Sequence, residues 1–455
     1  MIETPQLRPE LLNKYNLNGP RYTSYPTALE FHNRFDQEDF KLAIQDSTNK
    51  QLSLYVHVPF CHSMCYYCGC NKIVTRQKNK ADRYLDYLEQ EIVNRAPLFT
   101  HHKVIQLHLG GGTPSFLSAG QFTRLMGILR QHFQFQTQVE MSIEIDPREI
   151  ELNLLDHLKN LGFNRLSFGL QDTNLIVQEA INRVQDTEFV QALLTRAREL
   201  NYDSINLDLI YGLPHQTSAR FQQTLEKVML LNPDRISLFS YAHLPTRFAA
   251  QRKIRDEWLP SGDEKLSLML DAMAHFTANG YVAIGMDHFA KPDDELALAQ
   301  KQQILHRNFQ GYTTKGECDL LGLGVSSISS IGKAYAQNTK KLKDYYQAIE
   351  DKGQAVEKGV SLSQDDIIRG AVIKALMCNF MLDKDAISKQ FSINFDHYFK
   401  AELIKLNTFL TDGLITITPK SIMVLAEGRL LIRSIAMAFD AYLNAATTQA
   451  FSKVI

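Results

Sequence analysis

The sequence predicts an α/β fold, a partial (β/α)6 barrel, with a smaller and mainly helical C-terminal domain and an N-terminal arm. Two observations lead to this prediction. Short apolar runs typical of buried strands recur between residues 52 and 241, and stretches with helical periodicity separate them. Too few βα units are found for a closed eight-stranded barrel, so we expect an open one.

The expected strands are short runs rich in aliphatic residues. They span Leu52–Val58, Val104–Leu109, Val139–Ile145, Arg165–Phe168, Ser204–Ile210 and Arg235–Tyr241. Helices are expected between and after them, at Asp82–Arg95, Gln121–Phe133, Leu152–Leu161, Glu188–Leu200, Phe221–Leu231 and Glu264–Asn279. In the first of these, Tyr84, Leu88 and Ile92 recur at four-residue steps, which places them on one helix face.

Three segments make up the expected domain organisation: an arm at 1–50, the barrel at 51–335 and a winged-helix-like domain at 336–455. The arm contains the proline- and tyrosine-rich segment 19–26, which suits an extended strap over the main domain or a plain lead-in. Residues 285–335 resemble a loop-rich connection. The last segment predicts helices at 365–378 and 396–410, a hairpin at 414–425 and a final helix at 428–443.

Composition excludes several classes of protein. The chain has 455 residues, 44% hydrophobic content and a net charge of −1, so disorder is not expected to dominate and no global field attracts nucleic acid. No apolar stretch reaches the roughly 18 residues of a membrane span, and the first residues lack the apolar core of a signal peptide. We expect a cytoplasmic protein without membrane or nucleic-acid partners, and a monomer by default.

Cysteines gather in one loop directly after the first expected strand. Four of the six in the chain lie there, at Cys61, Cys65, Cys68 and Cys70, while Cys318 and Cys378 stand alone. The C-x3-C-x2-C spacing of the first three favours a [4Fe-4S] cluster with one iron lacking a protein ligand. A zinc site that uses all four thiols and a thiol redox pair are the alternatives. The lone cysteines are expected to be buried structural thiols.

Other residues typical of chemistry also follow the expected strands. Gly110–Pro114 follows the second, Glu144 and Asp146 end the third, Gly169–Asp172 follows the fourth and Asp208 lies late in the fifth. The carboxyl ends of parallel strands meet at one edge of the sheet, where ligands bind. These residues are therefore expected to converge with the cysteine loop.

The cysteine spacing, the aromatic Tyr67 before the third cysteine and the glycine-rich segment after the second strand resemble the radical S-adenosylmethionine (radical SAM) superfamily. The resemblance implies that the open iron binds S-adenosylmethionine and that one-electron reduction cleaves it to a 5′-deoxyadenosyl radical. In this superfamily the glycine segment usually carries a glutamate where this chain has Gly112. The polar contact is then expected from backbone groups or from Glu144.

Longer motifs narrow the resemblance to the oxygen-independent coproporphyrinogen III oxidase family. They are the segments 21–26, 68–71, 308–312 and 319–324, and the similarity covers essentially the whole chain. It implies the oxidative decarboxylation of two propionates of coproporphyrinogen III to vinyl groups, which gives protoporphyrinogen IX in haem and porphyrin biosynthesis. An electron donor and an electron acceptor are also implied, and the sequence identifies neither of them.

The same resemblance assigns residues to a cluster, to two molecules of S-adenosylmethionine and to turnover. Cys61, Cys65 and Cys68 are the expected cluster ligands, and Cys70 is expected to be needed for turnover but not for holding the cluster. Residues expected at the cluster-bound S-adenosylmethionine are Tyr55, Gly111 and Glu144. Residues expected at the second molecule are Tyr67, Gly112, Thr113, Gln171, Arg183, Asp208, Ala242 and Ile328.

Some interpretations stay open at this point. A substrate with four carboxylates needs cations, for which Arg21, Lys72, Arg76 and Arg252 are candidates, although most such residues are solvated surface charges. Arg183 and Asp208, taken without the resemblance, would be surface or salt-bridging residues. A haem-binding chaperone of the same superfamily is the rival function, and a radical enzyme acting on another substrate is a third possibility.

Overall fold

Six parallel strands form the centre of the sheet, within a few residues of their predicted bounds. They are β1 (Gln51–Val58), β4 (Lys103–Gly111), β5 (Gln134–Ile145), β6 (Arg165–Gln171), β7 (Ser204–Tyr211) and β8 (Arg235–Ser240). Each pairs in parallel with the next in the order β1-β4-β5-β6-β7-β8. The predicted partial barrel of βα units is therefore confirmed.

The computed structural model describes residues 8–444 and 451–453. It divides into two compact units. The barrel unit comprises 31–272 and 317–361, and the C-terminal unit comprises 1–30, 273–316 and 362–455. These units cut across the expected segments 1–50, 51–335 and 336–455, which remain a prediction about domains.

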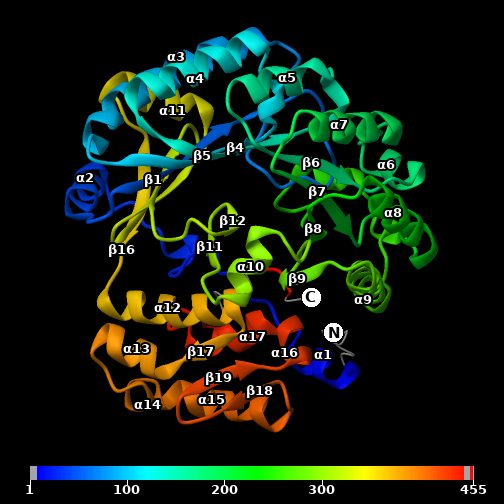
Figure 1. Ribbon diagram of the computed structural model, residues 1–455, viewed down its shortest axis with the longest axis vertical. Helices are drawn as coiled ribbons and strands as arrows, with labels where there is room; N and C mark the ends of the chain where they lie inside the picture. The colour runs from blue at the N-terminus through cyan, green and yellow to red at the C-terminus, as the bar shows by residue number, and fades with distance from the viewer. Residues whose placement is uncertain (1–7, 445–450, 454–455) are drawn as a thin grey trace. The chain divides into compact units, whose positions relative to one another are not determined.

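Helices follow the strands of the barrel unit and lie on the outer side of the strand arc (Figure 1). They are α3 (Asn79–Arg95), α4 (Ala119–His132), α5 (Asn153–Asn160), α6 (Leu175–Ala180), α7 (Thr187–Glu199) and α8 (Ser218–Leu231). α9 (Gly262–Ala278) comes later, and α2 (Gln37–Asp46) precedes β1. Local signals set several starts: the Ser118 side chain caps α4 by accepting from the backbone N–H of Gln121 at 3.3 Å.

The expectation of a loop-rich connection at 285–335 was wrong. The fully buried strand β13 (Asp319–Leu323) pairs in parallel with β1. The antiparallel strands β14 (Ile328–Ile331), β15 (Ala334–Asn338) and β16 (Val356–Ser361) extend the same edge. α11 (Leu342–Lys352) connects the last two strands. β13 is too short and too rich in glycine to show a periodicity, so only its pairing reveals it.

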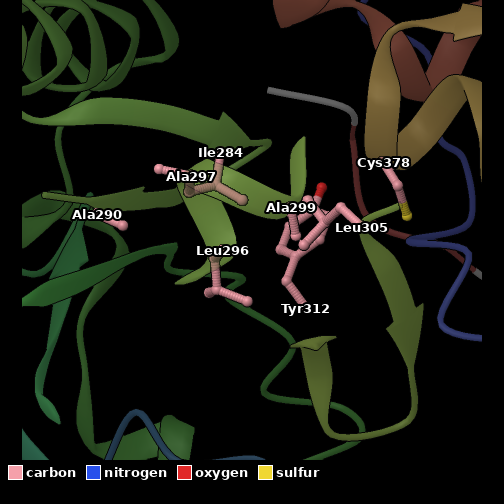
Figure 2. Packing of buried hydrophobic residues seen from close by; sticks show 8 residues of the cluster. All are labelled: Ile284, Ala290, Leu296, Ala297, Ala299, Leu305, Tyr312 and Cys378. Atoms are coloured by element: carbon pink, nitrogen blue, oxygen red, sulfur yellow. The ribbon is translucent and has the colours of Figure 1, made fainter. Parts of the chain in front are cut away.

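The C-terminal unit contains a small core of its own. The hairpin β9 (Val282–Gly285) and β10 (His288–Ala290) is followed by α10 (Glu295–Lys301), β11 (His306–Asn308) and β12 (Gly311–Thr313). Figure 2 shows their apolar side chains packed with Cys378 of α12 (Gln364–Asn379). Cys378 is thus a buried structural thiol as predicted, whereas Cys318 is only half-buried.

Helices dominate the rest of this unit. α13 (Lys384–Phe391), α14 (Phe395–Tyr398) and α15 (Lys400–Thr411) precede the predicted hairpin, β18 (Ile415–Ile417) and β19 (Ser421–Val424), and β17 (Met381–Asp383) adds a third strand. The continuous helix expected at 428–443 is wrong. Two short helices, α16 (Ala426–Leu430) and α17 (Ile432–Ala436), stand there, because the backbone of Leu431 leaves the helical conformation between them.

The N-terminal arm is not simply extended, since α1 (Pro9–Tyr15) forms within it. Its tyrosine-rich segment finds partners near the C-terminus of the same unit. Tyr22 Oη donates to Asp440 at 3.0 Å, and Tyr25 Oη accepts from the backbone N–H of Ala441 at 2.9 Å. Arg433 Nε donates to the carbonyl oxygen of Pro20 at 3.0 Å. The surface that covers these aromatic rings is thus supplied by residues 433–441.

Membrane-spanning helices are not found. In the part of the chain that the structure describes, no helix combines the length and the apolar character needed to cross a bilayer.

Candidate active site

The cysteine loop is closed at its base by two short strands. β2 (Phe60–Cys61) and β3 (Ile73–Val74) pair in parallel, with Cys61 opposite Val74. The backbone N–H of Thr75 donates to the carbonyl oxygen of Cys61 at 2.9 Å. The loop that joins β2 to β3 therefore carries Cys65, Cys68 and Cys70.

The first two thiols each have polar partners suited to a sulfur ligand. Cys61 Sγ lies 3.3 Å from Thr113 Oγ1, and burial raises the pKa of this thiol to about 11. Cys65 Sγ accepts from Arg148 Nη2 at 3.3 Å and from Arg183 Nη1 at 3.5 Å. Two guanidinium groups directed at one sulfur can donate hydrogen bonds to a metal-bound thiolate, which is the kind of outer contact that tunes an iron–sulfur cluster.

Cys68 and Cys70 lie side by side at the end of the loop. A hydrogen bond between their side chains lowers the pKa of Cys68 to about 5 and raises that of Cys70 well above its usual value. Lys72 Nζ adds positive charge nearby and donates to the carbonyl oxygen of Cys68 at 2.8 Å. The third predicted ligand, Cys68, and the predicted turnover residue, Cys70, thus lie within reach of one another.

These thiols fit an iron–sulfur cluster by their chemistry. Three sulfurs come from one loop, and Cys65 and Cys68 each have positively charged side chains beside them. Among the described residues, no three His, Cys, Asp or Glu side chains gather closely enough to hold a single metal ion. A [4Fe-4S] cluster makes a different demand, because each thiolate binds a separate iron.

A carboxylate at the end of β5 holds both arginines in place. Arg148 donates to the two oxygens of Asp146 through Nε and Nη2, at 2.9 and 2.6 Å, and Arg183 Nη1 donates at 3.0 Å. Burial alone would raise the pKa of Asp146, but Arg183 and Arg148 outweigh it and hold that pKa well below its usual range. The salt bridge considered for Arg183 is therefore present, and the same guanidinium reaches Cys65.

Tyr55, Gly111 and Glu144 lie together at the ends of β1, β4 and β5. Glu144 Oε2 accepts from the backbone N–H of Gly111 at 3.2 Å. A Cβ built on the adjacent Gly110 would lie 3.0 Å from Glu144 Oε1 and 3.1 Å from Tyr55 Cε2. Glu144 is thus placed beside the glycine segment, as expected from the absence of a glutamate at Gly112, and its side chain is 44% exposed.

His57 connects this group to the cysteine loop. Burial lowers its pKa, so the ring is neutral. Its Nε2 donates to the carbonyl oxygen of Asn71 at 3.1 Å, so its Nδ1 accepts from Tyr55 Oη at 3.2 Å. The ring also excludes any side chain at Gly111, where φ is +119° and a Cβ would lie 2.6 Å from the ring. These two hydrogen bonds give His57 a structural role between Tyr55 and the end of the cysteine loop.

Gly112 and Thr113 approach the cysteine loop through backbone and hydroxyl atoms. A Cβ on Gly112 would lie 2.6 Å from the carbonyl oxygen of Pro59, too close for any other residue. Thr113 follows with its hydroxyl against Cys61. The glycine segment is therefore tight enough to fix the thiol that begins the loop.

The side chains of Arg183 and Gln171 both lie close to the backbone of Gly169. A Cβ on Gly169 would lie 2.8 Å from both Arg183 Nη2 and Gln171 Nε2. Gln171 has a positive φ of 64°, and its Oε1 is buried without a hydrogen-bond partner, as is Arg183 Nε. Buried polar atoms of this kind are normally satisfied, so they point to a polar ligand here.

Asp208 lies one strand further, opposite Gly169 in the register of β6 and β7. It accepts from Asn206 Nδ2 at 2.8 Å and from Ser167 Oγ at 3.3 Å. Burial raises its pKa to about 6. It is therefore neither the surface residue nor the salt-bridging residue considered as alternatives, since its recorded partners are neutral.

The remaining residues predicted for the second S-adenosylmethionine fall into two places. Gln251 Nε2 donates to the carbonyl oxygens of Tyr67 and Ala242, at 2.9 and 3.1 Å, and so joins these two. Ile328 begins β14, beyond β13 on the other side of β1. Sheet order thus places Ile328 nearer to Tyr55 than to Asp208.

Of the predicted cations, one is engaged by the cysteine loop. Lys72 donates to Cys68, as described above, and Arg76 is exposed. Arg252 Nε donates to the carbonyl oxygen of Pro245 at 3.1 Å. Arg21 forms an ion pair with Asp287 within the C-terminal unit.

Several residues of this region were missed from the sequence. Arg148 contacts Cys65 across 83 residues of chain, and Gln251 contacts Tyr67 across 184. The one available signal was the position of Arg148, two residues after a carboxylate that ends a strand. Tyr84 was assigned only to a helix face, and Glu91 was not singled out. Tyr84 Oη in fact donates to the carbonyl oxygen of His57 at 2.6 Å.

Comparison with known proteins shows similarity along the whole chain. The radical SAM superfamily matches residues 55–228, and the HemN C-terminal domain matches residues 362–431. Oxygen-independent coproporphyrinogen III oxidase from Escherichia coli K12 is 58% identical over 446 residues, 98% of each chain. The protein of that name from Pseudomonas aeruginosa is 48% identical over 461 residues, 100% of each.

A solved structure gives the same result. Coproporphyrinogen III oxidase from Escherichia coli, described as a radical SAM enzyme, superimposes with a TM-score of 0.94 at 56% identity. The match covers 96% of this chain and 100% of that one.

Proposed function

The chain belongs to the oxygen-independent coproporphyrinogen III oxidase family of radical SAM enzymes, and we propose on that basis that it converts two propionates of coproporphyrinogen III to vinyl groups. The product is protoporphyrinogen IX. Each propionate loses a hydrogen atom, an electron and carbon dioxide. When bound, the cluster supplies the electron that cleaves S-adenosylmethionine to a 5′-deoxyadenosyl radical.

The observation that carries the proposal is the set of three thiols on one loop, with Cys65 Sγ facing two guanidinium groups. Cys61, Cys65 and Cys68 would hold three irons of the cluster. The fourth would remain open for the amino and carboxylate groups of S-adenosylmethionine. Thiolate ligands must be deprotonated, and Arg148, Arg183 and Lys72 supply the positive charge that favours this.

For the cluster-bound S-adenosylmethionine, we propose contacts from Tyr55, Gly111 and Glu144. Glu144 is half-exposed and held at one oxygen by the backbone of Gly111. Its carboxylate can accept from a ligand ammonium group. Tyr55 is oriented by its hydrogen bond to His57.

Eight residues would contact a second S-adenosylmethionine: Tyr67, Gly112, Thr113, Gln171, Arg183, Asp208, Ala242 and Ile328. The proposal of a second molecule is supported by the unpaired buried atoms of Gln171 and Arg183. Arg183 suits a ligand carboxylate, and Asp208 suits hydroxyl or amino donors. Ile328 lies apart from the others in the sheet, because its strand is on the far side of β1.

Cys70 would act in turnover and not as a cluster ligand. It is exposed, and its side chain lies beside that of Cys68 without belonging to the C-x3-C-x2-C spacing. A free thiol at this place can donate a hydrogen bond or a proton. Its side chain is thereby distinguished from the three proposed ligands.

The partners follow from the reaction. One electron must enter from a donor and another must leave to an acceptor for each propionate. Crowded free thiols fit a reducing compartment, so we place the protein in the cytoplasm. We propose a monomer that binds no nucleic acid, because each group described above is complete within one chain.

One experiment tests the oxidase function against the chaperone. The cluster is reconstituted anaerobically, and the protein is supplied with S-adenosylmethionine, dithionite, coproporphyrinogen III and cell extract as the source of acceptor. Formation of vinyl product that depends on S-adenosylmethionine is expected. No vinyl product together with tight stoichiometric haem binding would establish the chaperone instead. The full-length similarity to proteins named as oxidases favours the first result.

A further inference from the structure

A stretch rich in basic residues directly follows the cysteines of the loop in the chain. Its basic residues are Lys72, Arg76, Lys78, Lys80 and Arg83. Asp82 is the one carboxylate in 72–83, and it accepts from Gln121 Nε2 at 2.7 Å. The whole chain has a net charge of −1, so this excess is local. All the basic residues of the run are exposed except Lys72, which is half-buried.

A second basic segment lies beside the first. It consists of Lys340, Lys341 and Lys343, all of them exposed. Asn71 Nδ2 donates to the carbonyl oxygen of Lys340 at 2.9 Å, which joins the two segments where the cysteine loop ends. On the helical side, the Arg83 guanidinium lies 5.0 Å from the ring centroid of Tyr346, one turn after Lys343 on α11. The lysines and arginines of 72–83 and 340–343 thus form one surface, here named the basic face.

Carboxylates of the chain do not neutralise this face. Among the described residues, none of its lysines or arginines forms an ion pair with an Asp or Glu side chain. Asp86, which follows the run on α3, is paired with Arg124 at 2.8 Å. Asp344 is exposed beside Lys343 and offsets only part of the charge. The face therefore presents net positive charge to solvent.

The basic face begins at the proposed cluster. Lys72 Nζ donates to the carbonyl oxygen of Cys68 at 2.8 Å, and the carbonyl oxygen of Asn71 accepts from His57 Nε2 at 3.1 Å. A molecule bound to this face would lie against the chain that carries the third thiol. Because electron transfer slows steeply with distance, this is a favourable place for an electron to enter.

We propose that the basic face docks an acidic protein that carries single electrons at low potential and reduces the site formed by Cys61, Cys65 and Cys68. The inference rests on the proposed function, since only that function requires one-electron supply at these cysteines. Opposite charge on the carrier gives complementarity, and long-range attraction raises the rate of encounter. The exposure of the side chains suits a transient protein contact better than an enclosed small-molecule site.

Charge reversal tests this docking surface. The variant Lys80→Glu/Lys341→Glu/Lys343→Glu changes three exposed residues and leaves Lys72 and Arg76 intact. The reconstituted protein is mixed anaerobically with a flavodoxin in its hydroquinone state, and bleaching of the cluster absorbance is followed by stopped flow. We expect the second-order rate constant to fall about 10- to 100-fold at low salt. The difference should shrink at high salt, because the Debye length falls to about 3 Å at 1 M.

The control is Lys103→Glu/Lys227→Glu/Lys405→Glu, which changes the net charge equally at exposed lysines elsewhere. It should slow reduction by flavodoxin far less. Dithionite bypasses the docking step, so reduction and turnover with dithionite should stay within about twofold of wild type for both variants. Equal slowing by flavodoxin in both variants would overturn the proposal.

Two further outcomes would also overturn it. A raised KM for coproporphyrinogen III with dithionite in the first variant would assign the face to the substrate carboxylates. Tight binding of a short single-stranded RNA that is lost in this variant, with unchanged flavodoxin kinetics, would assign it to nucleic acid. Failure of the proposed function is distinguishable from all of these, because wild-type protein with dithionite would then give no vinyl product.

Discussion

Two buried ionic clusters of the barrel unit differ in where their guanidinium groups are directed. Under α3, Glu91 accepts from the backbone N–H of Gly324 at 2.7 Å, from Tyr345 Oη at 2.8 Å and from Asn338 Nδ2 at 2.8 Å. Arg95 lies 3.2 Å from the same carboxylate and donates to Asn338 Oδ1 at 2.9 Å. This cluster satisfies the carboxylate from within the protein.

The cluster at the end of β5 is organised differently. Asp146 holds Arg148 and Arg183, yet both guanidinium groups also reach Cys65 Sγ. Nε is buried without a hydrogen-bond partner in both Arg95 and Arg183, so the contacts to Cys65 make the difference. Its donors therefore extend to atoms outside the ionic cluster. The comparison teaches that burial of charge alone does not mark a functional site, whereas donors directed at a nucleophilic or ligating atom do.

The largest expected effect is at Cys65, the sulfur that Arg148 and Arg183 contact. Cys65→Ser should abolish the iron–sulfur absorbance, because serine is a poor ligand for iron. Cys70→Ser should retain iron and lose turnover. Iron analysis and the activity assay measure these results, with Cys378→Ser as a control for a thiol outside the loop. Full iron content in Cys65→Ser would refute the assignment of the ligand.

The next largest effect is on the stability of the protein, at the ionic cluster of Glu91 and Arg95. Glu91→Ala leaves Arg95 buried without its counter-charge, and should lower the free energy of unfolding by about 3–5 kcal/mol. Glu89→Ala, on the same helix, removes an exposed partner of Arg124 and should cost about 0.2–1 kcal/mol. Urea unfolding of the apoprotein measures both. Equal losses in the two variants would remove the distinction between the buried and the exposed pair.

A smaller effect is expected when the ionic cluster around Asp146 loses Arg148, one of its two donors to Cys65. Arg148→Met keeps a long side chain but removes both the positive charge and the hydrogen bond to Cys65. Reduction of the iron–sulfur cluster therefore becomes less favourable. We expect the ratio of reduced to oxidised cluster to fall about tenfold at fixed potential, equivalent to about 59 mV. An EPR-monitored redox titration measures this shift. Arg196→Met, at an exposed pair with Asp156, should leave the potential unchanged.

The smallest effect concerns the pH dependence of stability at Asp208. Its folded pKa is raised to about 6 from its usual 3.8, so the folded state binds more protons than the unfolded state between these values. Stability from this group is present below the unfolded pKa and is lost as pH rises toward the folded one. Asp208→Asn should therefore gain stability relative to wild type between about pH 4 and about pH 7. A pH-independent difference in urea unfolding would contradict the raised pKa.

The repeating βα units could be predicted from the sequence. The short strand β13 and the break in the helix expected at 428–443 could not. The six parallel strands and their helices follow hydrophobic periodicity, and the cysteine loop follows from spacing within one segment. β13 was missed because its five residues are all buried and Gly322 interrupts the leucines, so they carry no period. The helix expected at 428–443 breaks at Leu431, where apolar periodicity continues through a change of backbone conformation.

The site divides in the same way. Residues at strand ends, such as Glu144 and Asp208, were found because parallel strands deliver their ends to one edge. The contact of Arg148 with Cys65 depends on where two loops from different strands meet, and no local pattern encodes this. The coupling of Cys68 to Cys70 likewise depends on loop geometry, although both cysteines were visible in the sequence.

The central claim is that this chain generates a radical that removes a hydrogen atom from the propionates of coproporphyrinogen III. The most direct test supplies the reconstituted protein with coproporphyrinogen III that carries deuterium at the propionate β-carbons, and analyses the products by mass spectrometry. The account predicts vinyl product together with 5′-deoxyadenosine that has gained deuterium. Unlabelled 5′-deoxyadenosine without any vinyl product would contradict it.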